Sequence, residues 1–161
     1  MDLQTAGVIL LSVVFASYTM WIATSYEILY SISESYYRLQ KDKLSLLFYL
    51  FCLLLGLGIW PQILIENNDP ASASFFFSMA GIIFTGTAAA FKKELTAKVH
   101  YAGAGIAITG ALVGIWFAYG NWIPLALLLP LGGIAYLTTK NKIWWFEVVA
   151  FTLIIIGLII K

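Results

Sequence analysis

Six apolar stretches, each close to the length of one bilayer crossing, dominate the sequence. A helix needs roughly 20 apolar residues to cross the hydrocarbon core at a rise of about 1.5 Å per residue. The stretches lie at about 4–24, 44–65, 72–91, 99–119, 121–138 and 143–160. Hydrophobic residues make up 61% of the 161 residues and charged residues 11%, which is more apolar surface than a soluble domain of this length could bury. The sequence therefore predicts an all-α, polytopic bundle of six transmembrane helices, forming a single integral membrane domain over residues 1–161.

The first and fifth stretches need separate interpretation. The first follows "MDLQ", which carries an acid and no lysine or arginine, and no small-residue cleavage site follows it. We therefore expect a retained helix rather than a cleaved signal peptide. The fifth has Pro124 in its first turn and Pro130, Gly132 and Gly133 in its interior, so we expect a kinked or broken helix there.

The cations are distributed unevenly between the two ends of such a bundle. Eight of the nine fall in loops on one side of a six-helix weave: Arg38, Lys41, Lys43, Lys92, Lys93, Lys98, Lys140 and Lys142. Only Lys161 falls on the other side. Because lysine and arginine in short loops stay in the cytoplasm, both termini are predicted on the non-cytoplasmic side. The expected location is a multi-pass protein of a bacterial inner membrane.

The decapeptide "SISESYYRLQ", residues 31–40, separates the first two stretches. Ser31 and Glu34 have the spacing of a capping box, in which each side chain bonds a backbone N–H at the start of a helix. One interpretation is a short interfacial helix over about residues 32–40, with Arg38 reaching toward lipid phosphates. Another has Ser31, Ser33, Glu34 and Tyr37 folding back to line a pocket open to the cytoplasm. The two interpretations are compatible.

Ionisable side chains inside or at the edge of a span are costly and usually face a partner or a cavity. Glu27, His100 and Glu147 are such residues, and all three fall toward the predicted cytoplasmic leaflet. If the first, fourth and sixth stretches meet there, they form a polar pocket for a cation, a polar headgroup or a proton. The candidate ligand-binding residues are Glu27, Ser31, Ser33, Glu34, Tyr37, Arg38, His100, Tyr101 and Glu147.

The sequence carries no recognisable catalytic motif. A catalytic zinc needs three protein ligands, and with one histidine and one cysteine, Cys52, the chain could offer only a set such as His100, Glu34 and Glu147, which is not a usual zinc motif. No nucleophile-elbow motif marks an activated serine, and "GAGIAITG" lies in an apolar run typical of helix packing rather than phosphate binding. A net charge of +1 without a basic stripe excludes a nucleic-acid partner. We therefore expect no catalytic site, no metal and no cofactor.

Small residues recur at helical spacing in two of the stretches. One set is Gly103, Ala107, Gly110, Gly114 and Ala118, and the other is Ser74, Ser78, Gly81, Thr85 and Ala88. In lipid, small residues let helix backbones approach closely, so these two helices are predicted to pack against each other. Leu158, in the last stretch, is assigned to the lipid-facing side.

Three segments carry a resemblance to known proteins: "SISESYYRL", "FSMAGIIFTGTAAAF" and "KVHYAGAGI". They resemble uncharacterised small membrane proteins of bacteria and their phages. In those proteins a Ser-Ile-Ser-x-x-Tyr-Tyr stretch follows the first helix, a small-residue helix comes third, and a histidine opens the fourth. The resemblance implies a six-helix architecture and no particular activity.

The function that these features favour is a binding or accessory membrane protein with a one-sided polar pocket. A transporter or channel for a small solute, proton or ion is the alternative, although it requires polar lining through the whole bilayer. A membrane-embedded lipid-modifying enzyme or a phage-type lysis protein is a second alternative. The expected partners are the lipid bilayer, a lipid or small polar ligand, and a second copy of the chain.

Overall fold

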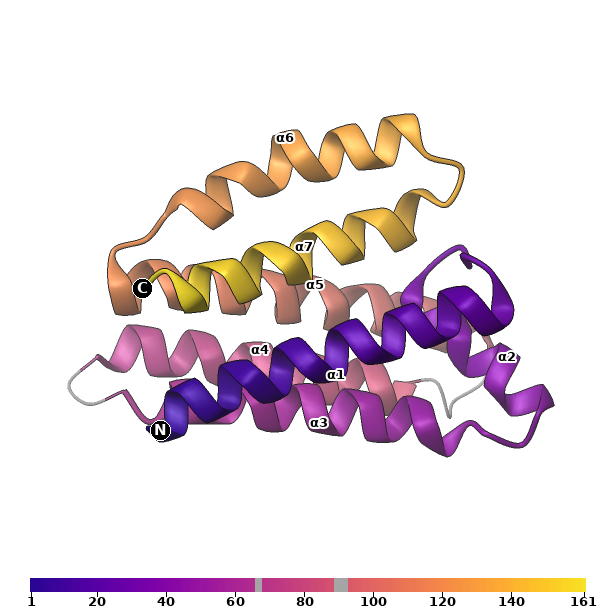
Figure 1. Cartoon of the computed structure of the whole chain (residues 1–161), viewed down its shortest axis with the longest axis horizontal. Coiled ribbons are helices and arrows are strands. Elements are labelled where there is room, and N and C mark those ends of the chain that lie inside the picture. The colour runs from indigo at the N-terminus through magenta and orange to yellow at the C-terminus, as the bar shows by residue number, and fades with distance from the viewer. Residues whose placement is uncertain (66–67, 89–92) are drawn as a thin grey trace.

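Six long helices run alternately between the two ends of the computed structural model (Figure 1). They are α1 (Leu3–Tyr26), α3 (Leu46–Ile63), α4 (Asp69–Ala88), α5 (Lys93–Tyr119), α6 (Ile123–Thr138) and α7 (Lys142–Ile159). A 3₁₀ turn, η1 (Ile32–Glu34), leads into the short helix α2 (Ser35–Lys41) between α1 and α3. The structure describes residues 1–65, 68–88 and 93–161, with the backbone alone over 93–100. Over these ranges the chain is all-helical, without a strand.

Five of the helices are long and apolar enough to cross a bilayer, which indicates a multi-pass membrane protein. They are α1, α3, α4, α7 and the part of α5 from Tyr101 to Tyr119. Helix α6 has 16 residues and is a shorter apolar helix. It continues unbroken past Pro130, so of the kink or break expected from its prolines and glycines, the break is not present.

The two ends of the bundle differ in what they contain. Both chain termini lie at one end, where Lys161 Nζ donates to Gln4 Oε1 at 3.2 Å (Figure 1). We call this the termini end. The connection between α1 and α2 and the turn before α7 lie at the opposite end, which we call the strap end.

Helices α4 and α5 pack as closely as their small residues predicted. A Cβ added to Gly81 would lie 2.6 Å from Gly103 O, and one added to Gly110 would lie 2.7 Å from Ser74 O. Ser78 Oγ donates to Ala107 O at 2.7 Å across the same interface. The predicted pairing of these two helices is confirmed, because only residues without bulky side chains fit such backbone contacts.

Helix α7 packs against α6 on one side and against α1 and α5 on the other (Figure 1). Leu158 is 1% exposed, so its assignment to the lipid-facing side was wrong. A helix that is apolar on all sides carries no signal in its own sequence for which side meets lipid. A Cβ on the neighbouring Gly157 would contact Pro124 of α6 and Ile115 of α5, which shows how closely these helices enclose α7.

Candidate functional site

The segment between α1 and α2 crosses the strap end of the bundle, and we call residues 27–34 the strap. It begins at Glu27, whose backbone has φ 67° and ψ 178°. Positive φ is uncommon for a residue with a side chain. This conformation ends α1 and turns the chain back across the bundle, leaving the Glu27 side chain exposed.

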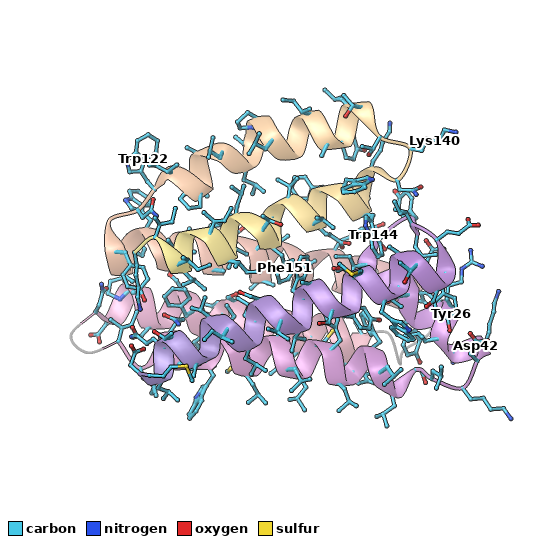
Figure 2. All side chains as sticks on the ribbon, in the orientation of Figure 1. Tyr26, Asp42, Trp122, Lys140, Trp144 and Phe151 are labelled. Carbon is cyan, nitrogen blue, oxygen red and sulfur yellow. The ribbon has the colours of Figure 1, made fainter. Side chains whose placement is uncertain are left out.

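Three hydrogen bonds fasten the strap to the first turns of α7. Asn141 Nδ2 donates to Ile28 O at 2.6 Å, the Trp144 N–H donates to Tyr30 O at 2.9 Å, and the Ile32 N–H donates to Glu147 Oε2 at 2.7 Å. The first N–H groups of a helix have no acceptor within the helix. The carbonyl of Tyr30 accepts one of these, the N–H of Trp144, for which α7 itself has no acceptor. Trp144, labelled in Figure 2, stands at this junction and is 3% exposed.

The strap is also ordered from within by the predicted capping box. Ser31 Oγ accepts the Glu34 N–H at 3.2 Å, as the spacing predicted. Glu34 Oε2 accepts the N–H of Tyr30 at 2.8 Å, one residue before the position expected. The predicted short helix is present as η1 followed by α2. Ser31 Oγ and Ser33 Oγ share a further hydrogen bond of 2.9 Å.

Helix α1 holds the far end of the strap in place. Tyr18 OH and Ser35 Oγ lie 2.6 Å apart, and Ser35 Oγ donates to Ile32 O at 2.5 Å. Ser35 is fully buried, and the Tyr18 ring is stacked on Phe51 of α3 at a centroid distance of 3.9 Å. The strap is therefore fixed to α7 on one side and to α1 on the other.

Beneath the strap lies a cavity of about 40 Å³ among α3, α4, α5 and α7. Ile32 and Ser33 of the strap form part of its wall, and Ala104 and Ala107 of α5 leave the space open. The aromatic part of the wall consists of Phe48, Phe51 and Phe151, the last of which Figure 2 shows between α7 and α1. Its polar side chains are Ser33, Cys52, Thr85 and Glu147.

Among the described residues of this wall, Glu147 is the one acidic side chain, and it is buried at 9% exposure. Its Oε2 atom bonds the strap N–H, which fixes the carboxyl at the edge of the cavity. A buried carboxylate requires hydrogen bonds or a counter-charge to offset the loss of water. Among the described residues, the hydrogen bond that this carboxylate accepts comes from the neutral N–H of Ile32 and not from a cationic side chain.

The structure brings some of the predicted site residues together and separates others. Ser31, Ser33 and Glu34 lie together in the strap, and Ser33 shares the cavity wall with Glu147. Tyr37 is half-buried and edge-on to Tyr36 at 5.3 Å, Tyr101 is 55% exposed, and Glu27 and Arg38 are exposed. The side chain of His100 lies outside the described residues. The described part of the chain holds no group of three His, Cys, Asp or Glu side chains placed to bind a metal ion.

Sequence reasoning missed the contribution of α3 and α4 to the cavity. The expected pocket used α1, α5 and α7, whereas the strap takes the place of α1, and Cys52 and Thr85 come from the two other helices. Phe15 of α1 stacks on Phe151 at 4.9 Å, so large side chains fill the side where α1 meets α7. The only sign of this contribution in the sequence was the Cys52 thiol and the Thr85 hydroxyl inside apolar spans. Both residue types are also common as packing residues in such helices, so they did not indicate a cavity.

Comparison with known proteins adds no assignment, because no protein-family model, curated protein or solved structure matches the chain.

Proposed function

We propose that this chain is an integral membrane binding protein whose ligand occupies the cavity beneath the strap. The observation that carries the proposal is the position of Glu147, a buried carboxylate at the edge of a small, mostly apolar cavity. Ligand pockets are typically apolar with a few fixed polar groups that orient the ligand. Glu147 is oriented in this way by its bond to the Ile32 N–H.

The termini end of the bundle supports binding rather than transport. Gln62 is fully buried there, where its Nε2 donates to Gln4 O at 3.3 Å and its Oε1 accepts from Tyr119 OH at 2.8 Å. These bonds join α1, α3 and α5 at the end opposite the cavity. Along α3, the buried Ile59 lies between Gln62 and Leu55, which belongs to the cavity wall. A solute path through the whole bundle would have to disrupt this packing.

We further propose that all six long helices cross the membrane, with the strap end in the cytoplasm. Arg38, Lys41, Lys43, Lys140 and Lys142 all belong to segments at that end. Trp122 and Lys140 lie at opposite ends of α6, as expected for an interfacial aromatic residue and a cytoplasmic cation (Figure 2). In a Cys52→Ala background, single cysteines at Asn121 and Lys140 should react with an impermeant thiol reagent from opposite sides. Reaction of both from one side would contradict the six-span topology.

The binding function can be tested by filling the cavity. Ala104→Leu places a larger side chain in the cavity wall, whereas Gly105→Leu places the same side chain where a Cβ meets nothing within 4 Å. Each variant and the wild type would be purified from membranes and denatured, and the released small molecules identified by mass spectrometry. A compound retained by the wild type and Gly105→Leu but absent from Ala104→Leu is the expected result. Identical profiles from all three proteins would contradict a ligand in the cavity.

A further inference from the structure

The chemistry of the cavity wall identifies the class of ligand, and this inference rests on the proposed binding function. We infer that the cavity binds a small primary ammonium ion, with the charged nitrogen against the Glu147 carboxylate. Four kinds of observation support this: the size of the cavity, the hydrogen-bonding groups around it, the aromatic rings in its wall, and the charge of Glu147.

The volume limits the ligand to a few non-hydrogen atoms. A cavity needs roughly 10–15 Å³ of this kind of volume for each water molecule it holds. About 40 Å³ therefore accommodates about three water-sized groups. Methylammonium and ethylammonium are of this size, whereas a lipid headgroup or an amino acid is too large.

The polar groups in the wall mainly offer hydrogen-bond acceptors. The hydroxyl hydrogen of Thr85 is donated to Gly81 O at 2.9 Å, so its oxygen has lone pairs left to offer. An ionised Glu147 accepts only, and the sulfur of Cys52 is a weak acceptor. A primary ammonium ion carries three N–H donors and no acceptor, which matches this set. A hard metal cation is a poorer match, because Ca²⁺ requires six to eight oxygen ligands and Mg²⁺ near-octahedral oxygen coordination.

The acidic side chain of Glu147 also favours a cationic ligand over a neutral one. Beside a neutral ligand, an ionised Glu147 would be a buried charge whose described hydrogen bond comes from a neutral backbone N–H. A cationic ligand neutralises this charge at the position where burial makes the attraction strong. The rings of Phe48, Phe51 and Phe151 in the wall can add cation–π attraction while covering the alkyl part of the ligand.

The test is equilibrium binding of radiolabelled methylammonium to the full chain in detergent, with NaCl holding the ionic strength constant. We expect saturable binding that unlabelled ethylammonium displaces. Tetramethylammonium should fail to displace it, because that ion has no N–H donor and is larger. Displacement by tetramethylammonium or by Na⁺ as effective as that by ethylammonium would overturn the inference, as would an absence of saturable binding.

Variants test the role of the carboxylate. Glu147→Gln keeps the shape and removes the charge, so it should weaken methylammonium binding by about 10-fold or more. Asp42→Asn removes a carboxylate at the same end of the bundle but outside the cavity, where it accepts from Tyr26 OH, and should leave binding unchanged. Figure 2 shows Tyr26 and Asp42 together at that end. Equal binding by wild type and Glu147→Gln would overturn the inference.

Two safeguards keep the outcome interpretable. If Glu147→Gln does not fold, the competition series on the wild type decides the question without it. If Ala104→Leu loses a co-purified neutral compound while methylammonium does not bind to the wild type, the ammonium ligand is wrong and the binding function stands. If Ala104→Leu loses no co-purified compound and methylammonium does not bind, both are wrong.

Discussion

Replacing Gly110 with alanine should destabilise the bundle, because the new methyl group meets the backbone of α4. The added Cβ would lie 2.7 Å from Ser74 O and 2.8 Å from Ser78 N, about 0.7 Å short of the 3.4 Å at which ordinary contact begins. Backbone atoms of a packed helix cannot rotate away as a side chain can, so α4 and α5 must separate. Overpacking of this kind costs about 1–3 kcal/mol.

The same separation should weaken the hydrogen bond across the interface. Adding about 0.7 Å to the 2.7 Å between Ser78 Oγ and Ala107 O stretches that distance to about 3.4 Å, where a hydrogen bond is weak. Such bonds contribute about 0.6 kcal/mol on average within membranes. Alanine regains about 1 kcal/mol through its higher helix propensity, so the expected loss in the free energy of unfolding for Gly110→Ala is about 1–2.5 kcal/mol.

Gly105→Ala is the matched control for this measurement. It lies on the same helix, gains the same helix propensity, and its Cβ meets nothing within 4 Å. Unfolding would be followed by circular dichroism in mixed micelles with increasing sodium dodecyl sulfate. If Gly110→Ala and Gly105→Ala unfold at the same detergent fraction, close backbone contact between α4 and α5 does not limit stability, and the reasoning is refuted.

Three further substitutions test other parts of the bundle. Gln62→Leu should lower the free energy of unfolding by about 1–2 kcal/mol, because it removes both hydrogen bonds at the termini end. Adding Tyr119→Phe to this variant should lower it little further, since the bond between the two side chains is already lost. Fully additive losses in the same unfolding assay would contradict the pairing. Glu34→Gln should change the unfolding free energy by less than about 0.5 kcal/mol, because a glutamine carbonyl can still accept the strap N–H; a larger loss would mean that the charge matters. The pKa of Asp2 lies below its ordinary value of 3.8 because the Thr5 N–H and hydroxyl donate to the carboxylate. The stabilisation from this cap on α1 is therefore fully present above pH 3.8 and is lost as the pH falls through the lowered pKa of the folded state. The Thr5 amide shift in nuclear magnetic resonance should report this transition and lose it in Asp2→Asn, and a pH-independent shift in the wild type would contradict the cap.

Much of the fold follows from local properties of the sequence. The expected span at about 4–24 corresponds to α1 at Leu3–Tyr26, and the one at 143–160 to α7 at Lys142–Ile159. Such agreement arises because span length and apolar composition are set by the bilayer and are readable one segment at a time. The Ser31 cap and the contact of Gly110 with α4 were predictable for the same reason, since each depends on residue type and short spacing.

The candidate site was predictable only in part. Glu147 was identified from the sequence because a carboxylate inside an apolar span is energetically costly and usually faces a partner or a cavity. Its partner could not be predicted, because Ile32 lies 115 residues away and contributes a backbone N–H, a group that every residue but proline carries. One of the two interpretations had Ser31, Ser33 and Glu34 folding back toward a pocket, but the positive φ of Glu27, which ends α1 and begins the strap, was not predictable.

The sequence alone determined approximately where the long apolar helices lie and which two of them pack through small residues. The tertiary structure alone decided which helices α7 packs against, with Leu158 buried, and that α3 and α4 complete the cavity with Cys52 and Thr85. The physical reason is that a membrane helix can be apolar on every side, whether it faces lipid or protein. Without a polar face to orient it, the rotation and neighbours of each helix depend on how all six fit together.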